Sequence, residues 1–322
     1  MLRWLLRRWF LVLLVMLIPS GLWVGSQLSA GRIDRLRSAI DPQTPTALVI
    51  LILFLMSVTL DNGKLRVEFL TQDGPRIVRL FVGGSTDNLL AEMPEMKAPT
   101  PHGDFFFRGG HRLWHSPEAT PRTYIPDHVG FRVEDLAHGV RLLQPAEVST
   151  GIRKTIELRL TPDKPSLTLN HTLTNEGPWP VELAPWAITQ LRLGGWVALP
   201  QTMGPLDGVG LLPNRQLVLW PYTRLDDPRF SPDDRMIVIE AQAALPPFKI
   251  GYMNRRGWAA YAIDSVLFVK HFTPQPERDH ADFGCNNEVY CNDQFVELET
   301  LGPLVRLDPG QSAYHQEIWE VR

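Results

Sequence analysis

Two carboxylates near the C-terminal end of the chain are spaced so that they can act together. Glu297 and Glu299 lie two positions apart in the segment FVELETL, which is predicted to be a strand. Because strand side chains alternate between the two faces of a sheet, both carboxylates are predicted to share one face, roughly 6.5–7 Å apart at Cα. A pair with this geometry can perform acid–base chemistry or bind the hydroxyl groups of a ligand.

Several hydrogen-bonding residues come directly before this pair. They are Asn286, Asn287, Glu288, Tyr290, Asn292 and Asp293. So many amide, hydroxyl and carboxylate groups indicate a site for a polyhydroxylated ligand rather than part of a core. The plainer alternative is that the carboxylate pair forms structural ion pairs with Arg108, Arg112 or Lys270.

A second group of polar and aromatic side chains lies in the segment 103–127. Within eight positions this segment contains Arg108, His111, Arg112, Trp114 and His115. Arginine and histidine can donate hydrogen bonds to hydroxyls, and a tryptophan can stack on a sugar face, so the segment is interpreted as one wall of a sugar cleft. A structured loop whose aromatic side chains pack on the core explains it equally well. The glycine pair at 109–110 permits positive φ or close approach of a ligand to the backbone.

The elements that must position these residues are strands. Residues 129–200 alternate over long distances, as in Ile152–Leu160, and no helical period of useful length is present. Asn62-Gly63 between apolar runs is a strong hairpin signal. The pattern predicts an all-β fold with long antiparallel strands. Trp220-Pro221-Tyr222, in the loop-rich stretch 201–240, is a candidate rim for the site.

The last forty residues also resemble a known family. The segment LET followed by GP, then LDPG and a closing strand to Val321, resembles the C-terminal end of the galactose mutarotase-like (aldose 1-epimerase-like) superfamily. The segment GGHRLW at 109–114 resembles an uncharacterised bacterial branch of it. The resemblance covers the chain from about Val58 onward and implies a β-supersandwich. It also places the general base of a sugar epimerase at Glu299.

The sequence departs from the family pattern at the catalytic acid. Active mutarotases carry a His-x-Tyr-Phe segment after the turn that corresponds to Thr174–Gly177, whereas this chain has Ala184-Pro185-Trp186. Interconverting sugar anomers needs a base for the C1 hydroxyl proton and an acid for the ring oxygen. The acid could be supplied by His111, His271 or His115 if folding brings one of them near the base, and Trp186 offers a stacking face instead.

These observations lead to a ranked set of functions. A carbohydrate-binding domain without catalysis is favoured, because the site is rich in amide and aromatic groups and the acid is missing. An aldose 1-epimerase-like isomerase is the alternative, and a glycoside hydrolase or lyase accessory domain using the carboxylate pair is a further one. The predicted ligand-binding residues are Arg108, His111, Arg112, Trp114, Trp186, Lys270, Glu288, Tyr290, Asn292 and Glu297. The ligand is expected to be a sugar or an oligosaccharide.

The N-terminal region differs from the rest of the chain. Residues 1–25 place three arginines ahead of an apolar run, as in a signal peptide or signal anchor. Residues 26–57 join a polar connector to a second apolar run, which is short for a span of about 20 residues. Residues 58–322 form the predicted sandwich domain. We expect membrane association through the N-terminal region, with the domain facing the periplasm or the cell exterior and the topology open.

Charge and cysteine content exclude other classes. The net charge is −3, and without residues 1–60 it is −7 (26 basic against 33 acidic residues), so a nucleic-acid surface is not expected. The two cysteines, Cys285 and Cys291, either form a disulfide or are two buried thiols. No Cys-x-x-Cys or Cys/His metal spacing is present, and no metal or cofactor is expected.

Overall fold

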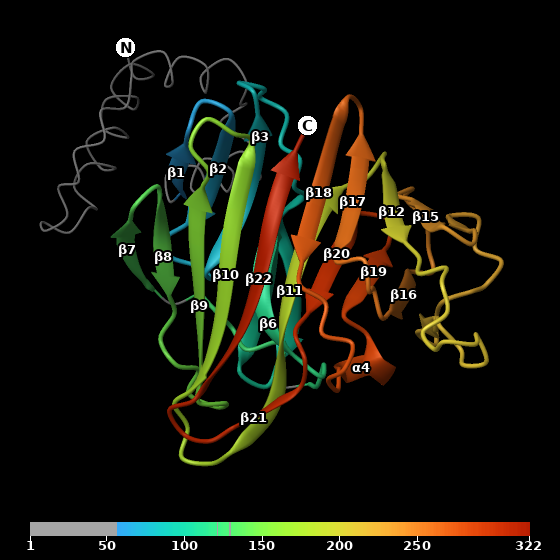
Figure 1. Ribbon diagram of the computed structural model, residues 1–322. Helices are drawn as coiled ribbons and strands as arrows, with labels where there is room; N and C mark the ends of the chain where they lie inside the picture. Colours follow the sequence, from blue (N-terminus) through green and yellow to red (C-terminus); the bar gives the residue numbers. More distant parts are fainter. Residues whose placement is uncertain (1–56, 121, 129) are drawn as a thin grey trace, which may run out of the picture. The chain divides into compact units, whose positions relative to one another are not determined.

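A computed structural model describes residues 57–120, 122–128 and 130–322 (Figure 1). Strands are the main regular elements of these residues, and the four-residue turn α4 (Ala281–Gly284) is the only helical segment among them. The prediction of an all-β fold is confirmed. The predicted signal or anchor segment 1–25 and the segment 26–57 with the second apolar run lie outside the described residues, except for Ser57, which begins β1. Within the described part, no helix has the length and hydropathy that crossing a membrane requires.

One of the two large sheets, called sheet 1 here, contains the strands that will carry the site. In spatial order its antiparallel strands are β1 (Ser57–Asp61), β2 (Leu65–Leu70), β3 (Arg76–Val82), β6 (His111–Ser116), β11 (Val181–Arg192), β20 (Phe295–Leu301), β19 (Asn287–Cys291), β16 (Phe248–Tyr252) and β13 (Val218–Leu219). The short β21 (Val305–Leu307) pairs with the far end of β11. Strands that are distant in sequence, such as β6 and β20, are thus separated only by β11.

The other large sheet, sheet 2, contains the longest hairpins. In spatial order its strands are β14 (Phe230–Pro232), β15 (Met236–Glu240), β12 (Trp196–Pro200), β17 (Trp258–Ile263), β18 (Val266–Phe272), β22 (Ser312–Val321), β10 (Ser166–Asn175), β9 (Ile152–Leu160), β8 (Gly139–Leu143) and β7 (Arg132–Leu136). Along β9, buried and half-exposed residues alternate without a break. This period of two gives sheet 2 one core face and one solvent face, as the sequence alternation predicts.

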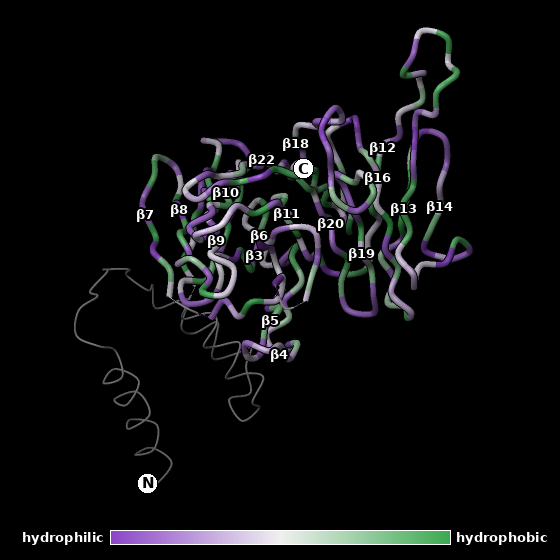
Figure 2. Tube along the Cα trace, turned by 90° about the horizontal axis from the view of Figure 1, so that it is seen from below, coloured by the Kyte–Doolittle hydropathy of each residue, from purple (hydrophilic) through white to green (hydrophobic). Residues whose placement is uncertain are grey.

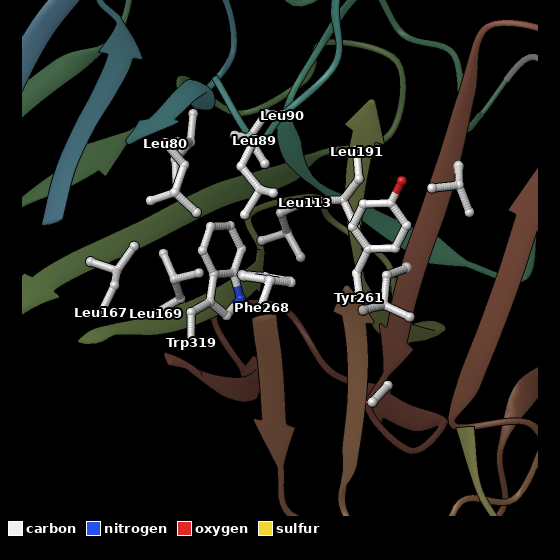
Figure 3. Packing of buried hydrophobic residues seen from close by; sticks show 14 of the residues in the cluster. Leu80, Leu89, Leu90, Leu113, Leu167, Leu169, Leu191, Tyr261, Phe268 and Trp319 are labelled. Carbon is white, nitrogen blue, oxygen red and sulfur yellow. The ribbon is translucent and has the colours of Figure 1, made fainter. Parts of the chain in front are cut away.

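The two sheets pack face to face around one apolar core. Leu113 and Leu191 from sheet 1 meet Leu169, Phe268 and Trp319 from sheet 2 (Figure 3). Trp319 is fully buried, and an aromatic side chain of that size makes a large contribution to the hydrophobic free energy of folding.

A separate hairpin covers the other face of sheet 1. It is formed by β4 (Glu92–Thr100) and β5 (Gly103–Gly109). Seen from below, β10 and β22 form one layer, β11, β6 and β3 form the next, and the hairpin lies beyond them (Figure 2). With this cover, every residue of β6 and β20 is buried. Sheet 1 therefore has buried side chains on both faces, and its outward face can hold a sheltered site.

The glycine pair between β5 and β6 serves chain packing. Gly109 and Gly110 have φ of 81° and 68°, which confirms the predicted positive φ. A Cβ on Gly110 would lie 1.9 Å from the carbonyl oxygen of Ile77, and one on Gly109 would lie 2.0 Å from that of Ala91. The backbone that approaches these glycines is therefore that of neighbouring segments, whereas the sequence also allowed a ligand there.

The two cysteines are free thiols. Cys285 and Cys291 are both buried, and no disulfide joins them. Burial raises the pKa of the Cys291 thiol to about 11. Of the two alternatives left open by the sequence, the structure contains the pair of buried thiols.

Candidate functional site

Strand register brings the two predicted segments together on the outward face of sheet 1. Arg112 on β6 is paired with Ile188 on β11, and Ile188 is paired with Glu299 on β20. Glu299 is in turn paired with Glu288 on β19. Side chains paired in this way lie abreast on one face. The segment around Arg112 and the segment 286–299 therefore form one continuous floor.

A cleft of about 360 Å³ lies above this floor. Its lining residues are Met96, Phe107, Arg112, Trp114, Glu118, Tyr124, Trp186, Ile188, Trp220, Tyr222, Pro247, Lys249, Tyr290, Phe295 and Glu297. Eight of these are aromatic, and they come from the β4–β5 hairpin, from the loops and from sheet 1. A mostly aromatic wall with a few charged groups on the floor is typical of a site for a small organic ligand.

The charged groups on the floor form two ion-paired sets. Arg112 Nη2 donates to Glu297 Oε1 at 3.0 Å, and the same oxygen accepts a hydrogen bond from Gln190 Nε2 at 3.0 Å. Lys249 Nζ lies 2.8 Å from Glu288 Oε2 and 3.1 Å from Glu299 Oε2. Glu297 therefore forms an ion pair with Arg112, as the alternative of structural ion pairs predicted. The partner of Glu299 is Lys249, which was not among the predicted partners.

Trp186 covers Glu299 from the cleft side. Its indole Nε1 donates to Glu299 Oε2 at 2.7 Å. The ammonium of Lys249 lies 4.9 Å from the centre of the Trp186 ring and 4.6 Å from that of Trp220. Glu299 is fully buried and does not line the cleft. Access to its carboxylate is therefore closed by an indole and an ammonium group.

Burial sets the protonation of this floor. It raises the pKa of Glu288 well above its usual range, where Glu299 adds to the effect and Lys249 opposes it. Burial also raises the pKa of Glu297, against the influence of Arg112. Burial alone would lower the pKa of Lys249, but the nearby carboxylates, Glu288 first, outweigh it and raise that pKa well above its usual value. Lys249 is consequently a permanent cation, held between two carboxyl groups.

Some buried polar atoms on the floor have no hydrogen-bond partner within the described residues. They include Arg112 Nε and Nη1, Gln190 Oε1, Glu288 Oε1 and Glu299 Oε1. Unsatisfied groups of this kind each cost about 1–3 kcal/mol and are rare in native interiors. Those of Arg112 belong to a residue that lines the cleft, whereas Gln190, Glu288 and Glu299 lie beneath the lining.

The predicted site residues separate into three groups. Those that line the cleft are Arg112, Trp114, Trp186, Tyr290 and Glu297. Glu288 and Glu299 lie buried beneath it. The others lie elsewhere. Arg108 pairs with Asp73. Asn292 accepts hydrogen bonds from the backbone N–H groups of Gln294 and Phe295. His111, Lys270 and His271 also lie outside the cleft.

None of the three histidines proposed as the acid reaches Glu299. His111 is adjacent to Arg112 on β6, so alternation sends it to the opposite face, where it contacts His171 of sheet 2. His271 is half-exposed on β18 and lies 3.9 Å from Glu320. His115 is buried beside Glu147, also at 3.9 Å. No histidine is among the described residues that line the cleft.

The sequence did not predict Lys249, Glu118 or Asp282 as cleft residues. It also did not predict Gln190, which lies beneath the lining and donates to Glu297. Trp220 and Tyr222, predicted as a rim, line the cleft. A single lysine inside the apolar strand FKIGY was a usable signal for Lys249. Its carboxylate partners lie about 40 and 50 positions away in the chain, so the ion pairs themselves leave no local pattern.

A chain of histidines lies between the sheets, behind the cleft floor. His171 Nδ1 donates to the carbonyl oxygen of His315 at 3.1 Å, so its Nε2 must accept, and His111 Nε2 lies 2.8 Å away to donate. His111 Nδ1 then accepts from the hydroxyl of Thr189 at 2.8 Å. Burial lowers the pKa of His111 well below its usual value and also lowers that of His171, which keeps both rings neutral.

Glu317 forms the other half of this buried network. Its carboxylate accepts from Trp319 Nε1 at 2.8 Å and from the Thr300 hydroxyl, and it lies 3.0 Å from Lys270 Nζ. Lys270 also donates to the carbonyl oxygen of Leu298 on β20, at 2.8 Å. Burial alone would raise the pKa of Glu317, but the ammonium of Lys270 is the largest of the opposing influences, and that pKa lies below its usual range.

Three residues of this network have the donor types of a metal site. One ligand atom from each of His111, His171 and Glu317 lies within 4.8 Å of the others. All three already have hydrogen-bond partners within the protein, and the ammonium of Lys270 lies beside the carboxylate. The donor set therefore fits a closed hydrogen-bond network better than a metal centre.

Fold and site together define a two-sheet β-sandwich protein with a cleft on one sheet that is lined mainly by aromatic side chains. No family model and no curated protein matches the sequence. A galactose mutarotase-like protein from Lactobacillus casei has a similar structure, with a TM-score of 0.54 and 13% identity over 83% of this chain and 100% of that one. A TPR-domain containing protein from Parabacteroides distasonis matches with a TM-score of 0.56 and 13% identity over 82% of this chain, which spans 46% of the matched chain. The chain thus has the galactose mutarotase-like (aldose 1-epimerase-like) fold that its C-terminal motifs predict.

Proposed function

We propose that the cleft on sheet 1 binds carbohydrate and that residues 58–322 act as a carbohydrate-binding domain. The observation that carries this proposal is the combination of eight aromatic side chains with a hydrogen-bonding floor in one cleft of about 360 Å³. Sugars present apolar C–H faces to aromatic rings and hydroxyls to charged and amide groups. Arg112, Glu297 and Lys249 supply those polar groups.

Binding is favoured over epimerisation by the surroundings of Glu299. A general base must come within hydrogen-bond reach of the proton it removes. Glu299 is fully buried, and its Oε2 is engaged by Trp186 and Lys249. No histidine among the described cleft residues can protonate a ring oxygen. The same burial disfavours a glycosidase that uses Glu297 and Glu299 as its carboxylate pair.

Trp220 gives a direct test of binding. Replacing it with alanine removes a ring that lines the cleft, and a favourable contact with such a ring is worth about 1 kcal/mol. We expect W220A to weaken sugar binding about fivefold to tenfold, measured by calorimetric titration with a panel of neutral mono- and disaccharides. The matched control is W179A, because Trp179 is 75% exposed and lies outside the cleft.

The proposal fails in either of two ways. The wild-type protein could bind no member of the panel at millimolar concentration, or W220A and W179A could reduce affinity equally. A change of affinity confined to W220A supports the cleft as the binding site.

We also propose that the domain is tethered to a membrane or exported through its N-terminal region. The support is the arginine-flanked apolar run in residues 1–25. We expect the full chain to sediment with membranes after cell lysis and a chain that starts at Val58 to stay in the supernatant. Equal partition of the two chains would reject the tether.

A further inference from the structure

The cleft has a second compartment that continues from the first. This compartment has a volume of about 350 Å³ and shares Glu118, Trp186, Trp220 and Lys249 with the aromatic compartment described above. Asp282 belongs to the second compartment alone. Small-molecule sites typically measure about 300–1,000 Å³. Each compartment can therefore hold a ligand unit, and the two together are larger than a single sugar ring needs.

The two compartments differ in chemistry. The first is lined mainly by aromatic rings. The second, called the polar compartment here, is lined by Thr120 and by the carboxylates of Glu118 and Asp282, beside the shared Lys249. A ligand that spans both would stack one unit on the rings and present the hydroxyls of the next unit to carboxylate oxygens.

The charges of the cleft select against anionic ligands. Both cations of the lining are compensated, since Arg112 pairs with Glu297, and Lys249 pairs with two buried carboxyl groups. The carboxylates of the polar compartment have only hydroxyl partners in the described structure: Glu118 accepts from Tyr124 at 2.5 Å, and Asp282 accepts from Ser116 Oγ at 3.4 Å. An anionic sugar would meet uncompensated negative charge there, whereas a neutral sugar would donate hydrogen bonds to it.

Backbone strain accompanies the placement of Asp282. Asp282 and Phe283 have φ of 51° and 58°, in the left-handed region that non-glycine residues rarely adopt. The side chain of Phe283 is 89% exposed, so packing of that ring does not hold the turn, although its carbonyl oxygen accepts from Gln216 Nε2 at 2.7 Å. Two successive residues of this kind form the turn that carries Asp282 to the polar compartment.

From these observations we infer that the cleft takes a neutral oligosaccharide of at least two sugar units. One unit lies in the aromatic compartment, and the next lies in the polar compartment, where Asp282 accepts its hydroxyl hydrogens. This inference rests on the proposed function and adds the class of ligand to it. Asp282 is then a specificity residue that acts on the second unit only.

Calorimetric titration of the full-length protein tests this inference. The probes are glucose and galactose, the neutral disaccharides maltose, cellobiose and lactose, and the anionic digalacturonic acid. We expect the best neutral disaccharide to bind at least tenfold more tightly than its monosaccharides, and digalacturonic acid to bind more weakly than that disaccharide. D282N should weaken disaccharide binding about fivefold or more and change monosaccharide binding less than twofold.

The control variant is D264N. Asp264 also has a positive φ, of 53°, and it lies in the turn between β17 and β18, outside the cleft, so asparagine is equally compatible with its backbone. Equal affinity for monosaccharides and disaccharides, tighter binding of digalacturonic acid, or equal effects of D282N and D264N would each overturn the inference and leave sugar binding intact. Absence of binding by every probe would instead reject the proposed function itself.

Discussion

Replacing Lys270 with methionine should lower the free energy of unfolding by about 3–5 kcal/mol, because it leaves a buried carboxylate without its cation. Lys270 and Glu317 are both fully buried, with Nζ and Oε1 3.0 Å apart. The substitution also leaves the carbonyl oxygen of Leu298 without the donor that it has at 2.8 Å. Urea unfolding followed by circular dichroism measures the loss.

Two further variants show whether the loss comes from the ion pair. K64M replaces a lysine on the exposed β1–β2 turn and should change stability by less than about 0.5 kcal/mol. The double variant K270M/E317L removes both charges and should recover a large part of the stability that K270M loses, since a buried charge is costly mainly when it is unpaired. If the double variant loses as much stability as K270M and E317L lose together when each is made alone, the ion pair is not the cause.

Acidification should destabilise the fold steeply from about pH 6.5 downward. The buried histidines have lowered pKa values in the folded chain, and burial lowers that of His315 to about 3. In the unfolded chain histidine takes up a proton near pH 6.5. The unfolded state therefore binds more protons than the folded state between these values, and stability falls as pH falls through this window. Below the usual range of glutamate, the lowered pKa of Glu317 adds a loss of the same sign.

The slope of stability against pH gives the size of the effect. Each histidine that titrates only in the unfolded state contributes about 1.4 kcal/mol per pH unit within this window. The raised pKa values of Glu288 and Glu297 act in the opposite direction, because the folded state then binds the extra proton. H315Q should reduce this slope, relative to the wild-type chain, by about the contribution of one histidine. An unchanged slope in H315Q would contradict this account.

The fold was predictable because its signals are local. Alternation in β9 and β10, the Asn62-Gly63 turn and the Asp308-Pro309-Gly310 turn are each read from a few neighbouring residues. The LET-GP-PG segment predicted which type of β-sandwich the chain forms, and a solved structure similar to this one has that fold. Segments of long period-two alternation leave few alternatives to antiparallel strands.

The site was predictable only where the strand pattern was applied. Glu297 and Glu299 were predicted to share one face, and they do. The prediction needed only the alternation of side chains along one strand, β20. The segment around Arg112 was treated as a wall or loop, although it is a strand. Because side chains alternate along this strand, Arg112 and Trp114 line the cleft, whereas His111 lies on the opposite face, in the core.

The remaining site features depend on contacts that are distant in sequence. Lys249 meets its carboxylate partners only after β16, β19 and β20 assemble into one sheet. The orientation of Asp282 comes from a backbone conformation that its residue type does not predict. Burial of Glu299 beneath Trp186 likewise follows from side-chain packing across β11 and β20.

The strand β20 is held by an ammonium group on each of its two faces. Lys249 contacts the Glu299 side chain from one side, and Lys270 contacts the Leu298 carbonyl from the other. Attempts to engineer a new specificity into this protein should therefore leave β20 unchanged and vary the loops that carry Glu118, Trp220 and Asp282. We expect a mutant library confined to those loops to change ligand binding and to spare expression yield and shelf life, because it leaves both contacts of β20 in place.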